Sequence, residues 1–159
     1  MLTLDGVAFQ LSDDGEEEGW GNGFYVTESD KDDGTLDISL EAYFTRPPGR
    51  YGDRFHDDPS ISLSPMPTGK KKLAEVAGMT FEVGSLKEAD EREDTFYMFE
   101  HEPFENYKLT VAEIKDGKAR IKCSGTAVWD SDARPHRTAE FEVECLLPVA
   151  KEDWEKYGF

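Results

Sequence analysis

The stretch "TLDISLEAYF", Thr35–Phe44, decides the fold. Its apolar residues alternate strictly with polar ones, and a period of two is that of a β-strand. One face of this strand is apolar, formed by Leu36, Ile38, Leu40, Ala42 and Phe44. Because the other face is polar, the strand is typical of an antiparallel sheet with one side packed on a core and one side in water.

The C-terminal third continues this pattern. The segments "YKLTVAEI" and "ARIKCSGTAVW" flank Asp116–Gly117, a dipeptide that favours a two-residue hairpin turn, and "TAEFEVECLLPV" follows. If these arms pair, basic and acidic side chains share one outer face and balance each other across the strands. The residues concerned are Lys118, Arg120, Lys122, Glu140, Glu142 and Glu144.

Further strands are predicted at Leu2–Leu11, Gly23–Thr27, Ile61–Ser64, Met79–Val83 and Thr95–His101. The tail is predicted as a short helix from Ala150 to about Tyr157, and Leu86–Asp94 as a loop. We therefore expect a single, mainly β domain over residues 1–159. Its predicted architecture is an antiparallel β-sandwich or strongly curved sheet with a short C-terminal helix.

The charge is strongly negative and uneven. The 159 residues carry a net charge of -17, and residues 1–60 hold 15 of the 35 acidic side chains against 4 basic ones. Such a field repels nucleic acid and anionic membranes and speeds encounters with basic proteins, although solubility or adaptation to high salt would also explain it. The chain has no signal-like start and no apolar run of membrane-helix length, so we expect a cytoplasmic protein without direct nucleic-acid or membrane binding.

Three acidic runs are the candidate partner-binding residues. The first lies in "DDGEEEGWGNG", where a tryptophan adds aromatic area beside the acids, and binding hot spots favour tryptophan. Its candidates are Asp13, Asp14, Glu16, Glu17, Glu18 and Trp20. The second run contributes Asp30, Asp32 and Asp33, and the third contributes Glu88, Asp90, Glu91, Glu93 and Asp94.

Acidic loops also suggest calcium. The segment Asp30–Glu41 has the length of an EF-hand loop, but Gly34 falls one position too early and the flanks alternate like strands. Calcium held between several loops stays open as an alternative. The three histidines, His56, His101 and His136, have no second histidine or cysteine at ligand spacing, and we expect neither a transition metal nor a cofactor.

Catalytic signatures are missing from the sequence. It contains no nucleophile elbow, and "PTGKKK" lacks the glycines and the hydroxyl residue of a phosphate loop. Cys123 and Cys145 face inward on adjacent predicted strands, where they would be reduced in the cytosol or, alternatively, bridged. The one basic loop, Thr45–Pro59, is expected to pair with the protein's own acids. We therefore expect a protein without catalytic activity.

In general character the whole chain resembles bacterial immunity proteins, which are small, acidic and often β-rich. The resemblance rests on the acidic runs and the strand pattern quoted above, and no residue role is carried over. It implies that the protein binds and inhibits a basic protein partner, a cognate bacterial toxin, by occluding its active site. The alternative function is a calcium- or ligand-binding β-sandwich module without catalytic activity.

Overall fold

The computed structural model describes residues 1–12, 21–46, 55 and 57–151. Eleven strands form one continuous hydrogen-bonded sheet. They are β1 (Leu2–Leu4), β2 (Val7–Leu11), β3 (Gly23–Glu28), β4 (Leu36–Thr45), β5 (Ser60–Pro67), β6 (Thr80–Val83), β7 (Thr95–Tyr97), β8 (His101–Glu102), β9 (Phe104–Lys115), β10 (Lys118–Asp130) and β11 (Arg137–Lys151). A 3-10 helix, η1 (Leu73–Val76), and one α-helix, α1 (Leu86–Arg92), complete the described part.

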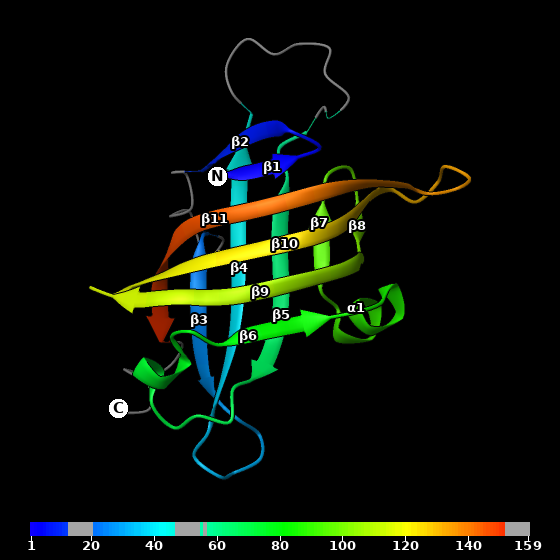
Figure 1. The fold of residues 1–159 in the computed structure, drawn as a ribbon. Coiled ribbons are helices and arrows are strands. Elements are labelled where there is room, and N and C mark those ends of the chain that lie inside the picture. Colours follow the sequence, from blue (N-terminus) through cyan, green and yellow to red (C-terminus); the bar gives the residue numbers. More distant parts are fainter. Residues whose placement is uncertain (13–20, 47–54, 56, 152–159) are drawn as a thin grey trace.

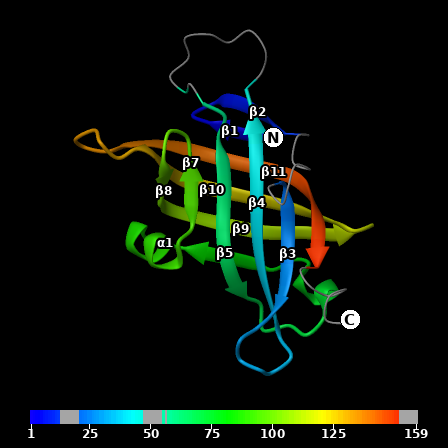
Figure 2. The same ribbon diagram turned by 180° about the vertical axis from the view of Figure 1, so that it is seen from behind.

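The sheet folds over into two layers (Figure 1). The first layer has the strand order β6–β9–β10–β11–β1–β2, and the second contains β3, β4, β5, β7 and β8. In Figure 2 the molecule is seen from the opposite side, so the second layer lies in front and its strands cross those of the first layer. The layers are joined where β2 pairs with β4 and where the end of β11 pairs with β3. Described pairings are antiparallel except that of β11 with β3, so the predicted, mainly antiparallel β architecture is confirmed.

The core lies between the two layers. The apolar face of β4 is buried as its alternation predicted, with exposed fractions of 5% or less. Opposite it, the first layer contributes a second set of buried side chains, among them Leu109, Val111, Ile121, Phe141 and Val143. Fully burying one such large apolar side chain contributes roughly 1.5–3 kcal/mol before chain entropy is counted.

Two Asp–Gly dipeptides make hairpin turns. Asp116 and Gly117 have positive φ angles of 53° and 72° and join β9 to β10, as predicted. Asp5 and Gly6, with φ angles of 43° and 83°, do the same between β1 and β2. The expected single strand Leu2–Leu11 is therefore two paired strands, and β1 lies between β11 and β2.

The helical segments differ from the prediction. Leu86–Asp94, expected as a loop, contains α1, which begins after the N-cap Ser85 and ends at Glu93 in the left-handed conformation with φ of 62°. At the C-terminus, Ala150 and Lys151 belong to β11 rather than to a helix, and residues 152–159 lie outside the described residues. The expected strand Thr95–His101 is instead split by a turn into β7 and β8.

Candidate functional site

The second acidic run lies in the hairpin loop between β3 and β4. Asp32 takes a positive φ of 53°, and Asp33 accepts hydrogen bonds from the backbone amide and the hydroxyl of Thr35. The loop is thus held by its own side chains. Thr35 also lowers the pKa of Asp33 below its ordinary value, because both hydrogen bonds stabilise the charged carboxylate.

The pKa of Asp37, at the start of β4, is shifted in the opposite direction, above its ordinary value. One of its carboxylate oxygens, Oδ1, is buried without a hydrogen-bond partner among the described residues. Burial raises the pKa of Asp37, and the nearby negative charge of Asp30 raises it further. The neighbouring acids of this loop therefore disfavour ionisation of Asp37.

A lysine-rich segment lies beside this loop. The backbone amide of Leu36 donates to the carbonyl oxygen of Lys70 at 2.8 Å. A Cβ atom placed on Gly34 would lie 4.0 Å from Cε of Lys71. The lysine-rich segment therefore lies against the acidic loop, although no ion pair between the two is seen among the described residues.

The third acidic run lies mainly on α1. Glu88, Asp90, Glu91 and Glu93 are exposed. Glu88 caps the helix start by accepting from the backbone amide of Gly84 at 3.1 Å. Because Lys87 pairs with Glu91 at 3.6 Å and this pair is well exposed, the ion pair contributes little to stability.

The prediction that Asp94 belongs to the partner-binding residues is wrong, because its side chain is fully buried. Its carboxylate accepts from Nε of Arg92 at 2.8 Å, the hydroxyl of Tyr107 at 2.7 Å and the backbone amide of Ser64 at 2.8 Å. Burial, followed by the Asp94 carboxylate, raises the pKa of Tyr107 above its ordinary value. Since Ser64 belongs to β5 and Tyr107 to β9, Asp94 ties the two layers together and does not form part of an exposed surface.

The structure does not bring the described acidic runs together. The β3–β4 loop and α1 lie at different corners of the molecule in both views (Figures 1 and 2). Asp13, Asp14, Glu16, Glu17, Glu18 and Trp20 lie outside the described residues.

The outer face of the first layer carries balanced charges, as the sequence predicted. Lys122 lies opposite Glu144 in the β10–β11 register, and Arg120 contacts Glu144 at 3.7 Å and Glu113 at 4.0 Å. Lys108 contacts Glu82 at 3.8 Å. This face is a solvated, mixed-charge surface.

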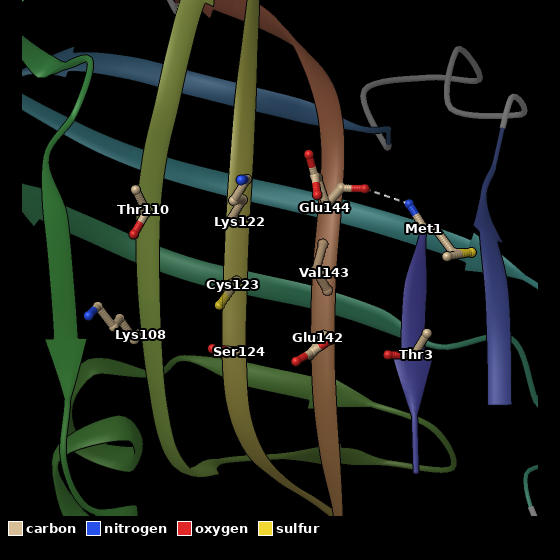
Figure 3. A pocket seen from close by; sticks show the side chains of 10 residues that line it. All are labelled: Met1, Thr3, Lys108, Thr110, Lys122, Cys123, Ser124, Glu142, Val143 and Glu144. Atoms are coloured by element: carbon tan, nitrogen blue, oxygen red, sulfur yellow. Dashed lines mark hydrogen bonds between the residues drawn. The ribbon is translucent and has the colours of Figure 1, made fainter. Parts of the chain in front are cut away.

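A hollow of about 470 Å³ lies on the same face (Figure 3). Its lining comes from four strands and the chain start, with Lys108, Thr110, Lys122, Ser124, Glu142, Glu144, Thr3 and Met1 among the residues shown. The amino group of Met1 donates to the carbonyl oxygen of Glu144 at 2.6 Å. Seven of the ten lining residues are charged or hydroxyl-bearing, and the described residues include no polar group that is buried in the hollow and aimed at a ligand. The hollow therefore indicates no particular ligand.

The outer face of the second layer has a different composition. Its half-buried, outward-facing side chains are mostly hydroxyl-bearing, and we call this set the hydroxyl face: Tyr25, Thr27, Asp37, Ser39, Glu41, Tyr43, Ser60, Ser62, Ser64, Thr95 and Tyr97. Sequence reasoning did not single it out, although the alternation in "SISLSP" places three serines on one side of a strand. In Figure 2 this layer faces the viewer, and no described element crosses it.

Where the structure describes them, the remaining reactive side chains show no catalytic arrangement. Cys123 and Cys145 are buried free thiols, and burial raises the pKa of both, that of Cys145 to about 11. His136 contacts Glu105 at 2.7 Å, and the ring centroid of His101 lies 5.1 Å from that of Tyr97 at a tilt of 46°. Among the described residues, no group of three or more histidine, cysteine or acidic side chains is placed to hold a metal ion. Within the same part of the chain, helices long and apolar enough to span a membrane are absent.

Comparison of the chain with protein-family models, with curated proteins and with solved structures gave no match.

Proposed function

We propose that this chain is an acidic, immunity-type protein that binds a basic protein partner, a cognate bacterial toxin, and inhibits it by occluding its active site. The observation that carries the proposal is the large and uneven charge, -17 overall with 15 of 35 acids in the first 60 residues. A net charge of this size raises the encounter rate with a positively charged protein and opposes binding to nucleic acid.

The distribution of ion pairs supports the same function. The outer face of the first layer pairs its lysines and arginines with its own glutamates. The acids of α1 outnumber its bases, and the three acids of the β3–β4 loop outnumber its one lysine. The excess negative charge is therefore directed outward from loops and helix surface, where it can meet a basic partner.

Inhibition by this protein would need no chemistry of its own. A rigid sheet laid over a partner's active site excludes the substrate sterically, and acidic side chains pair with the lysines and arginines that a nucleic-acid-directed enzyme uses for its substrate. The same lysines and arginines would explain why the partner is basic.

The test is to clone the gene adjacent to the one encoding this chain and to express its product with and without this chain. We expect the product to be basic and to arrest growth alone, and co-expression of this chain to restore growth. Calorimetry with the two purified proteins should then give a binding constant that weakens as salt rises, because exposed charges are screened. If neighbouring products neither bind nor are neutralised, the proposed function is wrong.

A further inference from the structure

The two sheet faces of this protein have different compositions, although both face outward. On the first layer, the outward side chains include long charged residues such as Lys108, Lys122 and Glu142, which are exposed. On the second layer, nine of the eleven residues of the hydroxyl face carry a hydroxyl group, and none is lysine or arginine. A requirement for solubility alone does not explain why one face carries many charged side chains, lysine and arginine among them, and the other carries two acids and no base.

The register places these hydroxyl side chains in rows across the strands. Tyr43 lies opposite Ser60, which lies opposite Tyr97, and Glu41 lies opposite Ser62, which lies opposite Thr95. Each row therefore has a serine at its centre with a larger side chain on either side. A hollow of about 270 Å³ also lies on this face, next to a register shift between Ile38 and Leu40. Its lining includes Tyr25, Ser39, Glu41, Ser62, Ser64 and Pro65.

Such a face is suited to contact with another protein. Tyrosine supplies a large contact area with few rotatable bonds, and serine supplies adaptable hydrogen bonds, which is the composition of antibody combining sites. Immobilising serine also costs less side-chain entropy than immobilising lysine or glutamate. Strands β3, β4, β5 and β7 contain 6, 10, 8 and 3 residues. At about 3.4 Å per residue and about 4.8 Å between strands they give a face of about 440 Å², roughly half of the ~800 Å² per partner of a standard interface.

We propose that the hydroxyl face is the docking surface for the basic partner, an inference that rests on the proposed function. The charge identifies the occupant. The face contains two acids, Asp37 and Glu41, and no base, and the acidic β3–β4 loop adjoins one end of it. A second copy of this chain would bring another charge of -17 against the same surface and be repelled.

The experiment compares one substitution on the two sheet faces. Ser62→Arg places a positive charge in the middle of the hydroxyl face, whereas Ser124→Arg makes the identical change on the outer face of the first layer. Both variants have the same net charge, so general electrostatic attraction changes equally. Calorimetry against the product of the adjacent gene should show at least about tenfold weaker binding for Ser62→Arg and little change for Ser124→Arg.

A second variant and a second readout ensure that a misfolded variant is not mistaken for one with a lost binding contact. Thr95→Arg adds the same charge next to Ser62 on the short strand β7, and circular dichroism checks that each variant is folded. Hydroxyl-radical footprinting of the unmodified chain should show Tyr25, Tyr43 and Tyr97 protected in the complex.

The outcomes separate the inference from the function on which it rests. If Ser62→Arg and Ser124→Arg weaken binding equally, or the three tyrosines stay reactive in the complex, the docking face is wrong and the inhibitor function stands. If the unmodified chain does not bind the adjacent gene product, both fail. Protection of these tyrosines when the chain alone is concentrated would assign the face to a second copy and overturn the inference.

Discussion

At the scale of single residues, the most consequential polar contact is the buried carboxylate of Asp94. Asp94→Asn keeps its shape but leaves Arg92, whose side chain is only 23% exposed, without a counter-charge. We expect a loss of about 2–3 kcal/mol in the free energy of unfolding, slightly below the cost of breaking a fully buried ion pair.

Tyr107→Phe is the matched comparison, because it removes one hydrogen bond from the same carboxylate and leaves the ion pair in place. The expected loss is smaller, about 1–2 kcal/mol. Urea denaturation measures both variants. An Asp94→Asn protein as stable as the unmodified chain would show that this network does not hold the layers together.

Asp37 and Asp33 give a second residue-scale prediction, one of pH dependence. The folded state raises the pKa of Asp37, so stability is lost as the pH rises above the ordinary aspartate range, and the loss is complete once the pH exceeds the raised pKa. Asp37→Asn should therefore stabilise the protein near about pH 7 by roughly 0.5 kcal/mol, a small figure because the residue is partly exposed and solvent screens its charge. The gain should vanish below about pH 4, the ordinary range of aspartate, because residue 37 is then neutral in the variant and in the unmodified protein.

Asp33→Asn is the control from the same loop, with the sign reversed. The folded state lowers the pKa of Asp33, so the stability that it contributes is present near neutral pH and is lost as the pH falls through the lowered value. This variant should melt at a lower temperature than the unmodified chain near neutral pH. If both variants melted higher than the unmodified chain near neutral pH, the assignment for Asp33 would be wrong, and if both melted lower, that for Asp37 would be wrong.

At the scale of the elements, the pairing of β9 with β10 depends on one close backbone approach. A side chain on Gly125 would place its Cβ 2.2 Å from the carbonyl oxygen of Asn106 and 2.8 Å from Cα of Tyr107. Gly125→Ala must therefore move one backbone away from the other, at a cost of about 1–3 kcal/mol in the free energy of unfolding.

Gly84→Ala is the control for that substitution, because no atom lies within 4 Å of the Cβ position on Gly84 and its φ is not positive. We expect little change in its denaturation midpoint. Equal midpoints for the two variants would mean that β9 and β10 tolerate the added methyl group.

The sequence predicted elements wherever the alternation was long. β4, β10 and β11 follow from their periods, but β1 and β2 were merged because each is short. The signal was present: Leu2 and Leu4 are buried at even positions and Phe9 at an odd one, a change of phase that a two-residue turn at Asp5–Gly6 produces. For α1, Ser85 and Glu88 form a helix-capping pattern in the sequence. The helix has only seven residues and few of them are apolar, so no helical period was visible.

The residues proposed to form a binding surface were harder to predict than the strands, for a physical reason. In "EADERED" nothing local distinguishes Asp94 from its exposed neighbours, because its burial depends on Ser64 and Tyr107, which are distant in sequence. The hydroxyl face likewise arises only when β3, β4, β5 and β7 lie side by side. Alternation gives the outward side of each strand, but strand order decides which outward sides form one surface.

At the scale of the whole molecule, the net charge of -17 must oppose folding through self-repulsion. The described ion pairs are mostly exposed and contribute little individually. Since salt shortens the screening length to about 10 Å at ~0.1 M, it should relieve repulsion more than it weakens these pairs. We therefore expect the melting temperature to rise with sodium chloride. Calorimetric scans measure it, and a falling melting temperature would mean that ion pairs outweigh the repulsion.

The same scans decide whether acidic loops bind calcium, when calcium chloride is compared with magnesium chloride at equal ionic strength. At equal ionic strength the two salts screen the protein's charges equally, so a protein stabilised only by relief of repulsion should melt at the same temperature in each. A specific site would add stability as the calcium concentration exceeds its dissociation constant, about 2.7 kcal/mol at a hundredfold excess. Because the described residues form no ligand cluster, we expect equal melting temperatures. A clear excess in calcium that chelation reverses would favour the calcium-binding module over the inhibitor.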